Sequence, residues 1–188
     1  MTARELQKIA ITDLAFHNTD RHLGNILYSQ KQSNFMQIDH ALVLPKDFMS
    51  EGTFAWASWP AAHYPFTEDS LQEISAMNFK KDRWRIKTVY PHYPEASLEV
   101  MEICYYLLKE GAAIGLTPFQ ISLFYQGFGD GLAGNLLMEM WKNHAEKDKE
   151  PRIVTMKKNL TVAMKKIQRA KPPLADKEAA QKLLAASS

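Results

Sequence analysis

The feature that most constrains this chain is the spacing of three polar residues near its N-terminus. Asp20 is followed by four residues and then by Asn25, and Asp39 lies 14 positions further on at the end of a short apolar run. A helical period of apolar residues precedes them, and two apolar runs, 24–28 and 35–39, flank a polar turn. This order predicts a helix, a loop and a hairpin, with Asn25 and Asp39 on loops that lie side by side.

A carboxylate, an amide and a second carboxylate at this spacing are typical of a phosphoryl-transfer loop. There the first carboxylate orients and deprotonates the attacking hydroxyl, while the amide and the second carboxylate hold the Mg²⁺ that bridges the phosphates of ATP. Positioning and charge neutralisation supply most of the catalysis of phosphoryl transfer, so the spacing carries chemical information. On spacing alone, turn and capping roles for Asp20 and Asn25 remain an open alternative.

The composition is that of a folded domain. With 188 residues, 46% of them hydrophobic, the chain fits one domain with a substantial core. Its single cysteine, Cys104, lies in an apolar run, so we expect buried packing in a reducing compartment. We see no secretory signal and no apolar run approaching the roughly 20 residues of a membrane span, and therefore expect a cytoplasmic protein that is at most peripheral to a membrane.

The rest of the chain has mainly helical patterns. Residues 41–66 look irregular, and a capped helix is expected to start at 67–70. Further helices are expected over 94–111, 117–125, 132–142 and 152–169. The predicted fold class is mainly α with a small β-hairpin. We expect one domain over residues 1–171 and a weakly ordered tail over 172–188.

The predicted helix 152–169 is basic. Residues 151–171 contain seven basic side chains and no acidic one, and an apolar stripe runs through Ile153, Met156, Leu160, Met164 and Ile167. Two interpretations are open: a helix that closes the domain with a solvated basic side, or an interfacial helix on an anionic membrane surface. Nucleic acid is not expected as a partner, because aromatic residues do not interleave with the basic run and no nucleic-acid motif is present.

Longer segments resemble a known family. Asn18-Thr19-Asp20-Arg21-His22-Leu23-Gly24-Asn25 and Ile38-Asp39-His40-Ala41 resemble the catalytic and metal-binding loops of phosphatidylinositol 3-/4-kinases, most closely the type II and plant gamma-type phosphatidylinositol 4-kinases. The similarity continues in family order through residues 54–62, 65–67 and 107–118, and so covers roughly residues 5–125. It implies the C-terminal lobe of a protein-kinase-like or lipid-kinase-like fold, with a catalytic loop at 13–27 and a metal-binding loop at 36–45.

The resemblance also implies roles for single residues. Asp20 would be the catalytic aspartate, and Arg21 and His22 would complete the catalytic signature, with His22 stabilising charge on the transferred phosphoryl group. Asn25 and Asp39 would hold Mg²⁺ (or Mn²⁺) and through it ATP, and the acceptor would be an inositol lipid or a protein. Ala41 stands where relatives usually have glycine, which gives up conformational freedom beside the metal site.

Three questions stay open at this point. The few residues ahead of Asp13 leave no room for a glycine-rich loop and an ATP-pairing lysine, so we expect a partner chain to be one source of an N-terminal lobe. The glycine-dense stretch 127–131 lacks a following Lys-Ser/Thr and is better explained as a helix connection. The first alternative function is therefore a catalytically inactive, kinase-derived binding or regulatory module.

The second alternative is a metal-dependent phosphohydrolase. Its ligands would come from a set of histidines and carboxylates, namely His17, Asp20, His22, Asp39 and His40.

Overall fold

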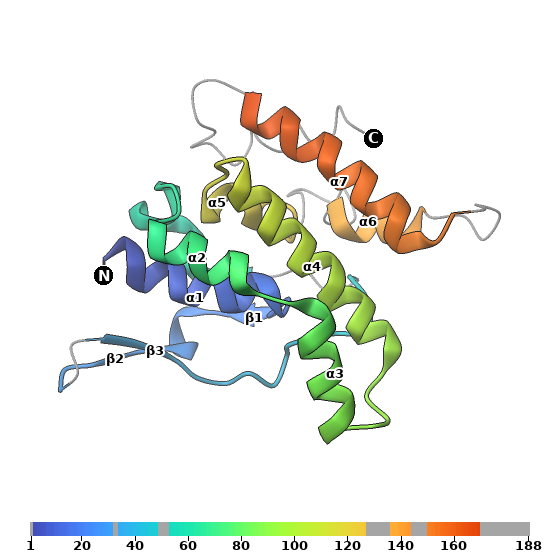
Figure 1. Cartoon of the computed structure of the whole chain (residues 1–188). Coiled ribbons are helices and arrows are strands. Elements are labelled where there is room, and N and C mark those ends of the chain that lie inside the picture. Colours follow the sequence, from blue (N-terminus) through green and yellow to red (C-terminus); the bar gives the residue numbers. More distant parts are fainter. Residues whose placement is uncertain (1, 32–33, 49–52, 127–135, 144–149, 170–188) are drawn as a thin grey trace.

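The computed structural model describes residues 2–31, 34–48, 53–126, 136–143 and 150–169, and shows a mostly helical body with a small β-hairpin at one edge (Figure 1). The helices are α1 (Ala3–Ala15), α2 (Glu68–Ala76), α3 (Phe79–Val89), α4 (Glu95–Ala113), α5 (Pro118–Ser122), α6 (Leu136–Lys142) and α7 (Arg152–Arg169). The strands are β1 (Asp20–Arg21), β2 (Ile26–Ser29), β3 (Asn34–Gln37) and β4 (Thr53–Phe54), with 3₁₀ turns at η1 (Leu23–Asn25), η2 (Ala55–Ser58) and η3 (Pro60–His63).

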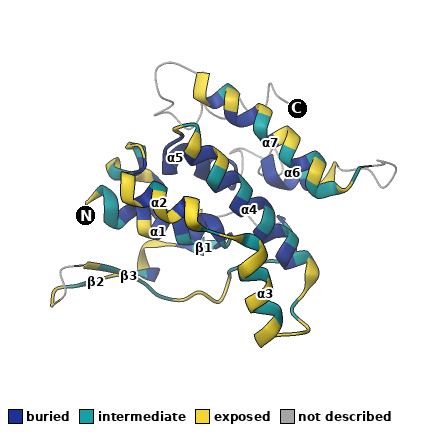
Figure 2. Cartoon of the chain, viewed as in Figure 1, coloured by how far each residue is buried: buried dark blue, intermediate teal, exposed yellow. Residues whose placement is uncertain are grey.

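Helix α4 is the centre of the core. It packs against α1, α2, α3, α5 and α7, and its apolar residues repeat densely enough to bury most of its surface (Figure 2). It ends where Gly115 adopts a φ of 84°, a conformation that glycine reaches without steric cost. Helix α1 lies against α4 and begins in a capping box between Thr2 and Glu5. These two helices fix the frame on which the loops that follow α1 are built.

Two short strand pairs lie beside this frame. Strands β2 and β3 form the antiparallel hairpin, with Ile26 opposite Gln37, and β1 pairs in parallel with β4, with Asp20 opposite Thr53. The hairpin was expected, but its strands are shorter than predicted. Gly24 and Asn25 belong to the 3₁₀ turn η1, and β3 stops before Asp39, which adopts a φ of 52° that a strand cannot continue through.

Other boundaries also differ from the expectation. The helix predicted over 117–125 ends at Ser122, and the region 41–66 contains β4, η2 and η3. Helices were expected over 94–111 and 132–142, and α4 (Glu95–Ala113) and α6 (Leu136–Lys142) occupy these places. The residues 127–131 and the predicted tail 172–188 lie outside the described part of the chain.

Helix α3 was not predicted. It is capped by Asn78, whose side chain accepts from the Lys81 N–H, but none of its residues is fully buried. A helix that buries so little has no continuous apolar stripe, so the spacing of its hydrophobic residues did not indicate a helix.

Helix α7 is the basic helix expected over 152–169, and its apolar stripe faces the core. Met156, Leu160, Met164 and Ile167 are buried where α7 packs on α4 and α6. Lys157 pairs with Glu102 of α4 at 2.6 Å and Arg152 pairs with Glu99 at 2.8 Å. This packing favours the closing-helix interpretation, because an apolar face used by the core is not available to lipid. No helix in the described ranges is both long and apolar enough to cross a membrane.

The segment after α5 ties back to α1 through one buried hydroxyl. Tyr125 donates to the carbonyl oxygen of Leu14 at 2.8 Å. Leu14 lies in the last turn of α1, where carbonyl groups lack a partner within the helix. The phenol therefore satisfies a group that would otherwise be buried without a hydrogen bond.

Tyr125→Phe should lower the free energy of unfolding by about 1–3 kcal/mol, because it leaves the Leu14 carbonyl buried and unpaired. Urea denaturation measures this change. Tyr64→Phe is the matched control, since Tyr64 is 60% exposed and its hydroxyl is hydrated in both the folded and the unfolded chain. Equal stability of the two variants would contradict the role given to Tyr125.

Candidate functional site

A buried carboxylate beneath residues 16–25 organises the side chains around it. Asp13, fully buried in α1, accepts hydrogen bonds from Asn18, Arg21, Gln37 and Trp56 at 3.0–3.1 Å. These donors come from the loop after α1, from β1, from β3 and from η2. We call these five residues the Asp13 hub. Burial raises the pKa of the Asp13 carboxyl, while the Arg21 charge and the hydrogen bonds from Trp56 and Asn18 oppose that rise.

Arg21 connects the hub to both loops of the candidate site. Its Nε donates to the two carboxylate oxygens of Asp13 at 3.0 Å, and its Nη1 donates to the carbonyl oxygens of Asn25 at 2.7 Å and Ile38 at 2.6 Å. The Ile38 N–H in turn donates to the Asn25 carbonyl at 3.1 Å. One guanidinium therefore holds the residue before Asp39 against Asn25.

Further backbone bonds fasten the Asp39 loop (residues 38–44) to the catalytic segment (residues 16–25). The Thr19 N–H donates to the Leu42 carbonyl at 3.0 Å, and the Leu44 N–H donates to the Phe16 carbonyl at 2.8 Å. The two segments are thus joined at Phe16, Thr19 and Asn25, along the length of the loop. The two loops therefore lie side by side, as the sequence predicts.

Strand alternation separates Asp20 from Arg21. Successive side chains of a strand point to opposite sides, so Arg21 enters the hub while the Asp20 side chain remains 44% exposed. The Nε2 of His22 lies 3.9 Å from a carboxylate oxygen of Asp20. The Gly24 N–H donates to Nδ1 of His22 at 3.0 Å, so the neutral ring carries its proton on Nε2, the nitrogen beside Asp20.

Gly24 permits this arrangement by its lack of a side chain. A Cβ at this position would lie 2.9 Å from Cε1 of His22. Any larger residue would push the imidazole away from the backbone that orients it. Glycine at position 24 therefore lets the His22 ring keep this position.

Asn25 and Asp39 have the donor atoms that a hard cation needs. The Asn25 side-chain nitrogen donates to the Asp20 carbonyl at 3.0 Å, which fixes the amide and leaves its oxygen as the acceptor. The exposed carboxylate of Asp39 accepts from the Ala41 N–H at 3.3 Å. An amide oxygen and a carboxylate on adjoining loops fit Mg²⁺ or Mn²⁺ better than Zn²⁺.

Backbone strain in the Asp39 loop lies at Asp39 and Leu44. Their φ angles are 52° and 51°, whereas Ala41 is not among the residues with positive φ. Aspartate tolerates this conformation better than most residues. The alanine that replaces the usual glycine of the resembling family therefore adds no strain in this structure.

His17 and His40 do not complete a metal cluster. His17 is fully buried, with its ring stacked on Phe48 at 5.1 Å between centroids and tilted against Tyr125 at 5.3 Å, and neither ring nitrogen has a hydrogen-bond partner. Within the described ranges, histidine, cysteine and carboxylate side chains form no group of three that could hold a metal. The ligand set of the phosphohydrolase alternative, which included His17, is therefore not brought together.

Comparison with known proteins agrees with this geometry. The family model for phosphatidylinositol 3- and 4-kinase matches residues 3–121, which include α1, the catalytic segment, the Asp39 loop and α4. The chain belongs to the phosphatidylinositol 3- and 4-kinase family.

Individual plant members of the family are similar to this chain. Phosphatidylinositol 4-kinase gamma 4 of Oryza sativa subsp. japonica is 38% identical over 121 residues, covering 63% of this chain and 21% of that protein. Phosphatidylinositol 4-kinase gamma 2 of Arabidopsis thaliana is 35% identical over 120 residues, covering 62% and 22%. The chain thus spans about a fifth of the length of the curated relatives it matches.

Several residues that shape this kinase-family site were missed by sequence reasoning. Asp13, Gln37 and Trp56 were not singled out as site residues, although Asp13 binds Arg21 and the other two donate to Asp13. One signal was available for Asp13. It lies four residues after Ile9 and seven after Leu6, on the buried face of α1, and a carboxylate on such a face requires a partner.

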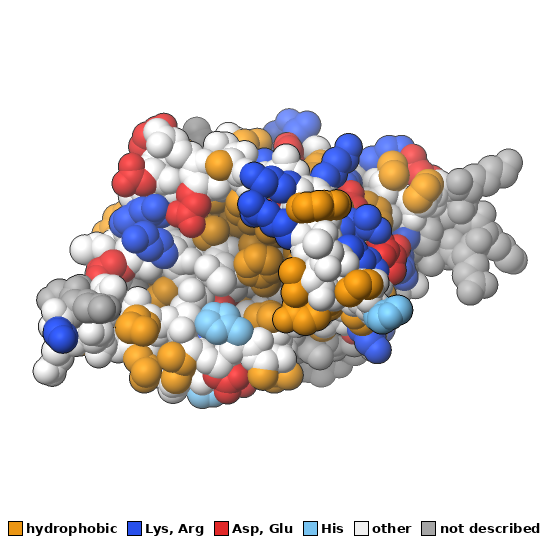
Figure 3. Space-filling view, turned by 60° about the horizontal axis from the view of Figure 1, so that its bottom comes forward, with side chains coloured by type: hydrophobic (Ala, Val, Ile, Leu, Met, Phe, Trp, Pro, Cys, Tyr) orange, Lys and Arg blue, Asp and Glu red, His pale blue; other side chains and the backbone are white. Residues whose placement is uncertain are grey.

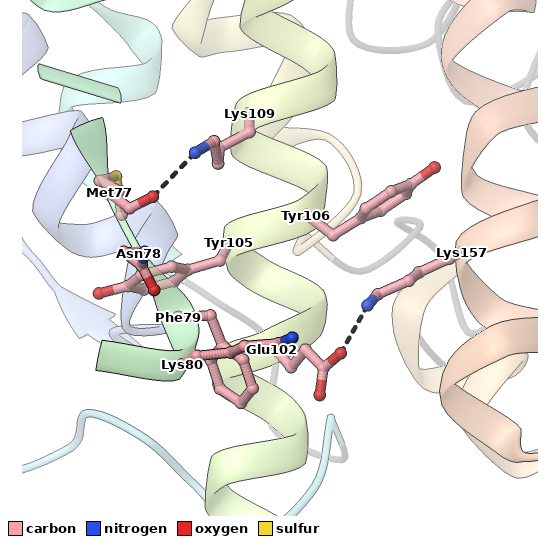
Figure 4. A pocket seen from close by; sticks show the side chains of 9 residues that line it. All are labelled: Met77, Asn78, Phe79, Lys80, Glu102, Tyr105, Tyr106, Lys109 and Lys157. Carbon is pink, nitrogen blue, oxygen red and sulfur yellow. Dashed lines mark hydrogen bonds and ion pairs between the residues drawn. The ribbon is translucent and has the colours of Figure 1, made fainter. Parts of the chain in front are cut away.

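A separate hollow of about 300 Å³ lies between α4, α7 and the start of α3 (Figure 4). Its lysines are largely engaged: Lys109 donates to the Met77 carbonyl at 2.8 Å, and Lys157 pairs with Glu102 at 2.6 Å. It shares no residue with the catalytic segment or the Asp39 loop. The candidate site, an exposed ledge formed by those two segments, is therefore separate from this hollow.

Trp56→Phe tests the hub while keeping the aromatic bulk. It removes the only indole donor to Asp13 among the described residues, and should lower the free energy of unfolding by about 1.5–3 kcal/mol because the lost bond is to a buried carboxylate. Urea denaturation gives the value. Trp59→Phe, three residues further on and outside the hub, is the control and should change stability much less. The role of the hub would be contradicted if the two substitutions had the same effect.

His17 should make stability depend on pH. Burial lowers its pKa from the ordinary 6.5 to about 3, so between these values the unfolded chain binds more protons and stability falls as the pH falls. From about pH 7.5 to pH 5 the loss should be about 2 kcal/mol. Asparagine tolerates the positive φ of position 17, so His17→Asn is the variant of choice. Urea titrations of this variant should no longer show the loss of about 2 kcal/mol between pH 7.5 and pH 5. An unchanged pH dependence would show that His17 is not the responsible group.

Proposed function

We propose that this chain supplies the acceptor-activating and metal-binding half of a phosphatidylinositol 4-kinase-like phosphotransferase. It would have the position of a kinase C-terminal lobe, use ATP with Mg²⁺, and transfer phosphate to a hydroxyl of an inositol lipid or of a protein. The observation that carries the proposal is that one buried guanidinium binds the carbonyl groups of Asn25 and of Ile38, the residue before Asp39, with Asp20 directed outward beside them.

Asp20 is suited to act on the acceptor. Its carboxylate is half-exposed, and its position is fixed from both sides, because its N–H donates to the Asn18 side chain at 3.0 Å and its carbonyl accepts from Asn25. It can take the proton of an attacking hydroxyl as that hydroxyl reaches the phosphate. His22, with its Nε2 proton at the edge of the same carboxylate, can donate to an oxygen of the transferred group.

Asn25 and Asp39 would hold the metal through the amide oxygen and the carboxylate. The metal would neutralise charge on the phosphates of the bound nucleotide. The chain's own contribution is rigidity, since the hub fixes both ligand-bearing loops before any ligand arrives. Such prior order lowers the cost of assembling the site.

The nucleotide also needs contacts that the described residues do not offer, namely a glycine-rich phosphate loop and a pairing lysine. An apolar surface flanks the site on η1, the hairpin and the Asp39 loop, and its members are 47–63% exposed: Leu23, Leu27, Tyr28, Met36 and Leu42. We propose that a nucleotide-binding lobe, from a further part of the same protein or from a partner chain, covers this surface. The relatives, roughly five times the length of the matched segment, leave room for such a lobe.

The test separates nucleotide binding from transfer. In the 188-residue chain Mg·ATP should bind with a dissociation constant of about 1 mM or weaker, because metal ligands without a phosphate loop hold phosphate loosely. Asp39→Asn should remove this binding in calorimetry. Asp20→Asn should leave binding intact and remove phosphate transfer to phosphatidylinositol vesicles or to a protein acceptor, because Asp20 acts on the acceptor.

Asp69→Asn is the matched control, since Asp69 is 77% exposed on α2 and lies outside the site. It should leave both binding and transfer unchanged. Wild-type transfer that survives Asp20→Asn would contradict the proposed role of Asp20. A different result would favour a non-catalytic regulatory module. In that case both Asp20→Asn and Asp39→Asn would still bind Mg·ATP, and neither the wild type nor any variant would transfer phosphate.

A further inference from the structure

Helix α3 uses only a narrow side to contact the body. On that side Phe79 packs edge-on against Tyr105 of α4, with ring centroids 6.2 Å apart, and Asp82 accepts from the Tyr105 hydroxyl at 3.4 Å. Ile86 lies on the same side and is partly buried. None of the helix residues is fully buried, and the helix projects from the body (Figures 1 and 2).

The opposite side of α3 combines an aromatic residue with basic ones. Lys80 and Trp84 are four residues apart, as are Lys81 and Arg85, and both pairs therefore lie on one helix face. All four are exposed, and Trp84 is 67% exposed. We call these four residues the outer face of α3.

The outer face has an unbalanced charge. The acidic residues near it are turned inward: Asp82 lies on the α4 side, and Glu95, at the start of α4, pairs with Arg83 and Lys87. Lys80 and Lys81 have no ion-pair partner within the described ranges. Arg85 makes one exposed contact, at 3.3 Å, with Asp82. The exposed Trp84 and its two lysine neighbours therefore contribute little to the packing of the domain.

A second apolar feature continues from the end of the helix. Residues 89–94 line a hollow of about 400 Å³, and Tyr90 among them is 63% exposed. Figure 3 shows the face of the molecule to which α3 projects, where Lys and Arg side chains border hydrophobic ones. The apolar surface beside the catalytic segment lies at the hairpin, on the same face of the body as α3 (Figures 1 and 3).

We propose that the outer face of α3 docks on an anionic membrane surface. Trp84, Val89 and Tyr90 would enter the region between headgroups and acyl chains, where amphipathic aromatic rings are favoured. Lys80, Lys81 and Arg85 would remain at the level of the anionic headgroups, which attract each basic side chain. An exposed indole between basic side chains is the composition favoured at the level of lipid headgroups, so the observations favour an anionic lipid surface over a protein segment.

This inference deepens the proposed function, because a docked α3 would turn the ledge that carries Asp20 toward a lipid acceptor. It differs from the interpretation that places the basic helix 152–169 on the membrane. The apolar stripe of that helix is buried in the core, whereas Trp84 on the outer face of α3 is exposed. The membrane contact therefore belongs to α3.

Sedimentation with vesicles tests the proposal without ATP or turnover. The full chain should bind vesicles of phosphatidylcholine with phosphatidylserine, and should bind pure phosphatidylcholine vesicles much more weakly. Lys80→Glu with Lys81→Glu should reduce the partition coefficient at least about tenfold. Lys165→Glu with Arg169→Glu is the matched control, because it makes the same charge change at exposed positions of α7 and should have a much smaller effect.

The apolar part has its own matched pair. Trp84→Ala should reduce binding several-fold, whereas Val162→Ala, at a 55% exposed position of α7, should leave it unchanged. Because all these side chains are exposed, circular dichroism should show the same helix content in every variant. Vesicle binding that survives without kinase activity would support the docking surface and reject the proposed enzyme.

The proposal would be overturned by equal losses in the α3 and α7 charge variants, by equal binding to neutral and anionic vesicles, or by no binding to anionic vesicles. Retention of binding by Trp84→Ala would also overturn it, because non-specific attraction of the lysines would then explain the result.

Discussion

The buried ion pair between Asp13 and Arg21 is the interaction on which the candidate site depends. A charged pair without exposed surface is costly unless further hydrogen bonds compensate it. Here Asn18, Gln37 and Trp56 donate to the Asp13 carboxylate, and Nη1 of Arg21 donates to two backbone carbonyl groups. Each of these donors lies on a different segment, so satisfying one carboxylate brings several parts of the chain together. Removing one partner of such a pair would leave an uncompensated buried charge. The site is therefore coupled to the stability of the domain.

The same pair also determines how the functional side chains point. Since Arg21 occupies the inner side of β1, strand alternation leaves Asp20 on the outer side. Since Nη1 of Arg21 donates to the carbonyl groups of Asn25 and Ile38, the segments that carry Asn25 and Asp39 cannot separate without breaking hydrogen bonds to a buried cation. The arrangement provides order before a ligand binds, which is what phosphoryl transfer requires of a protein.

Sequence reasoning identified the family, the helical class and the hairpin because these rest on local patterns. Asp20, Asn25 and Asp39 were proposed as site residues from their spacing, and the structure places the segments that carry them side by side. It missed β1 with β4, because two-residue pairs between distant segments have no periodicity. It missed α3, because this helix buries no residue fully. It gave His17 a role as an alternative metal ligand, whereas burial among Phe48 and Tyr125 keeps that ring neutral and inside the core.

Mn²⁺ titration into ¹⁵N-labelled protein tests most directly whether the Asp13 hub joins the Asn25 and Asp39 loops into one metal site. Mn²⁺ broadens the amide signals of residues close to it. We expect the signals of residues 20–25 and 38–41 to broaden together at low Mn²⁺, and Asp39→Asn to abolish the broadening of both segments. Broadening of only one segment, or broadening that persists in Asp39→Asn, would contradict the account.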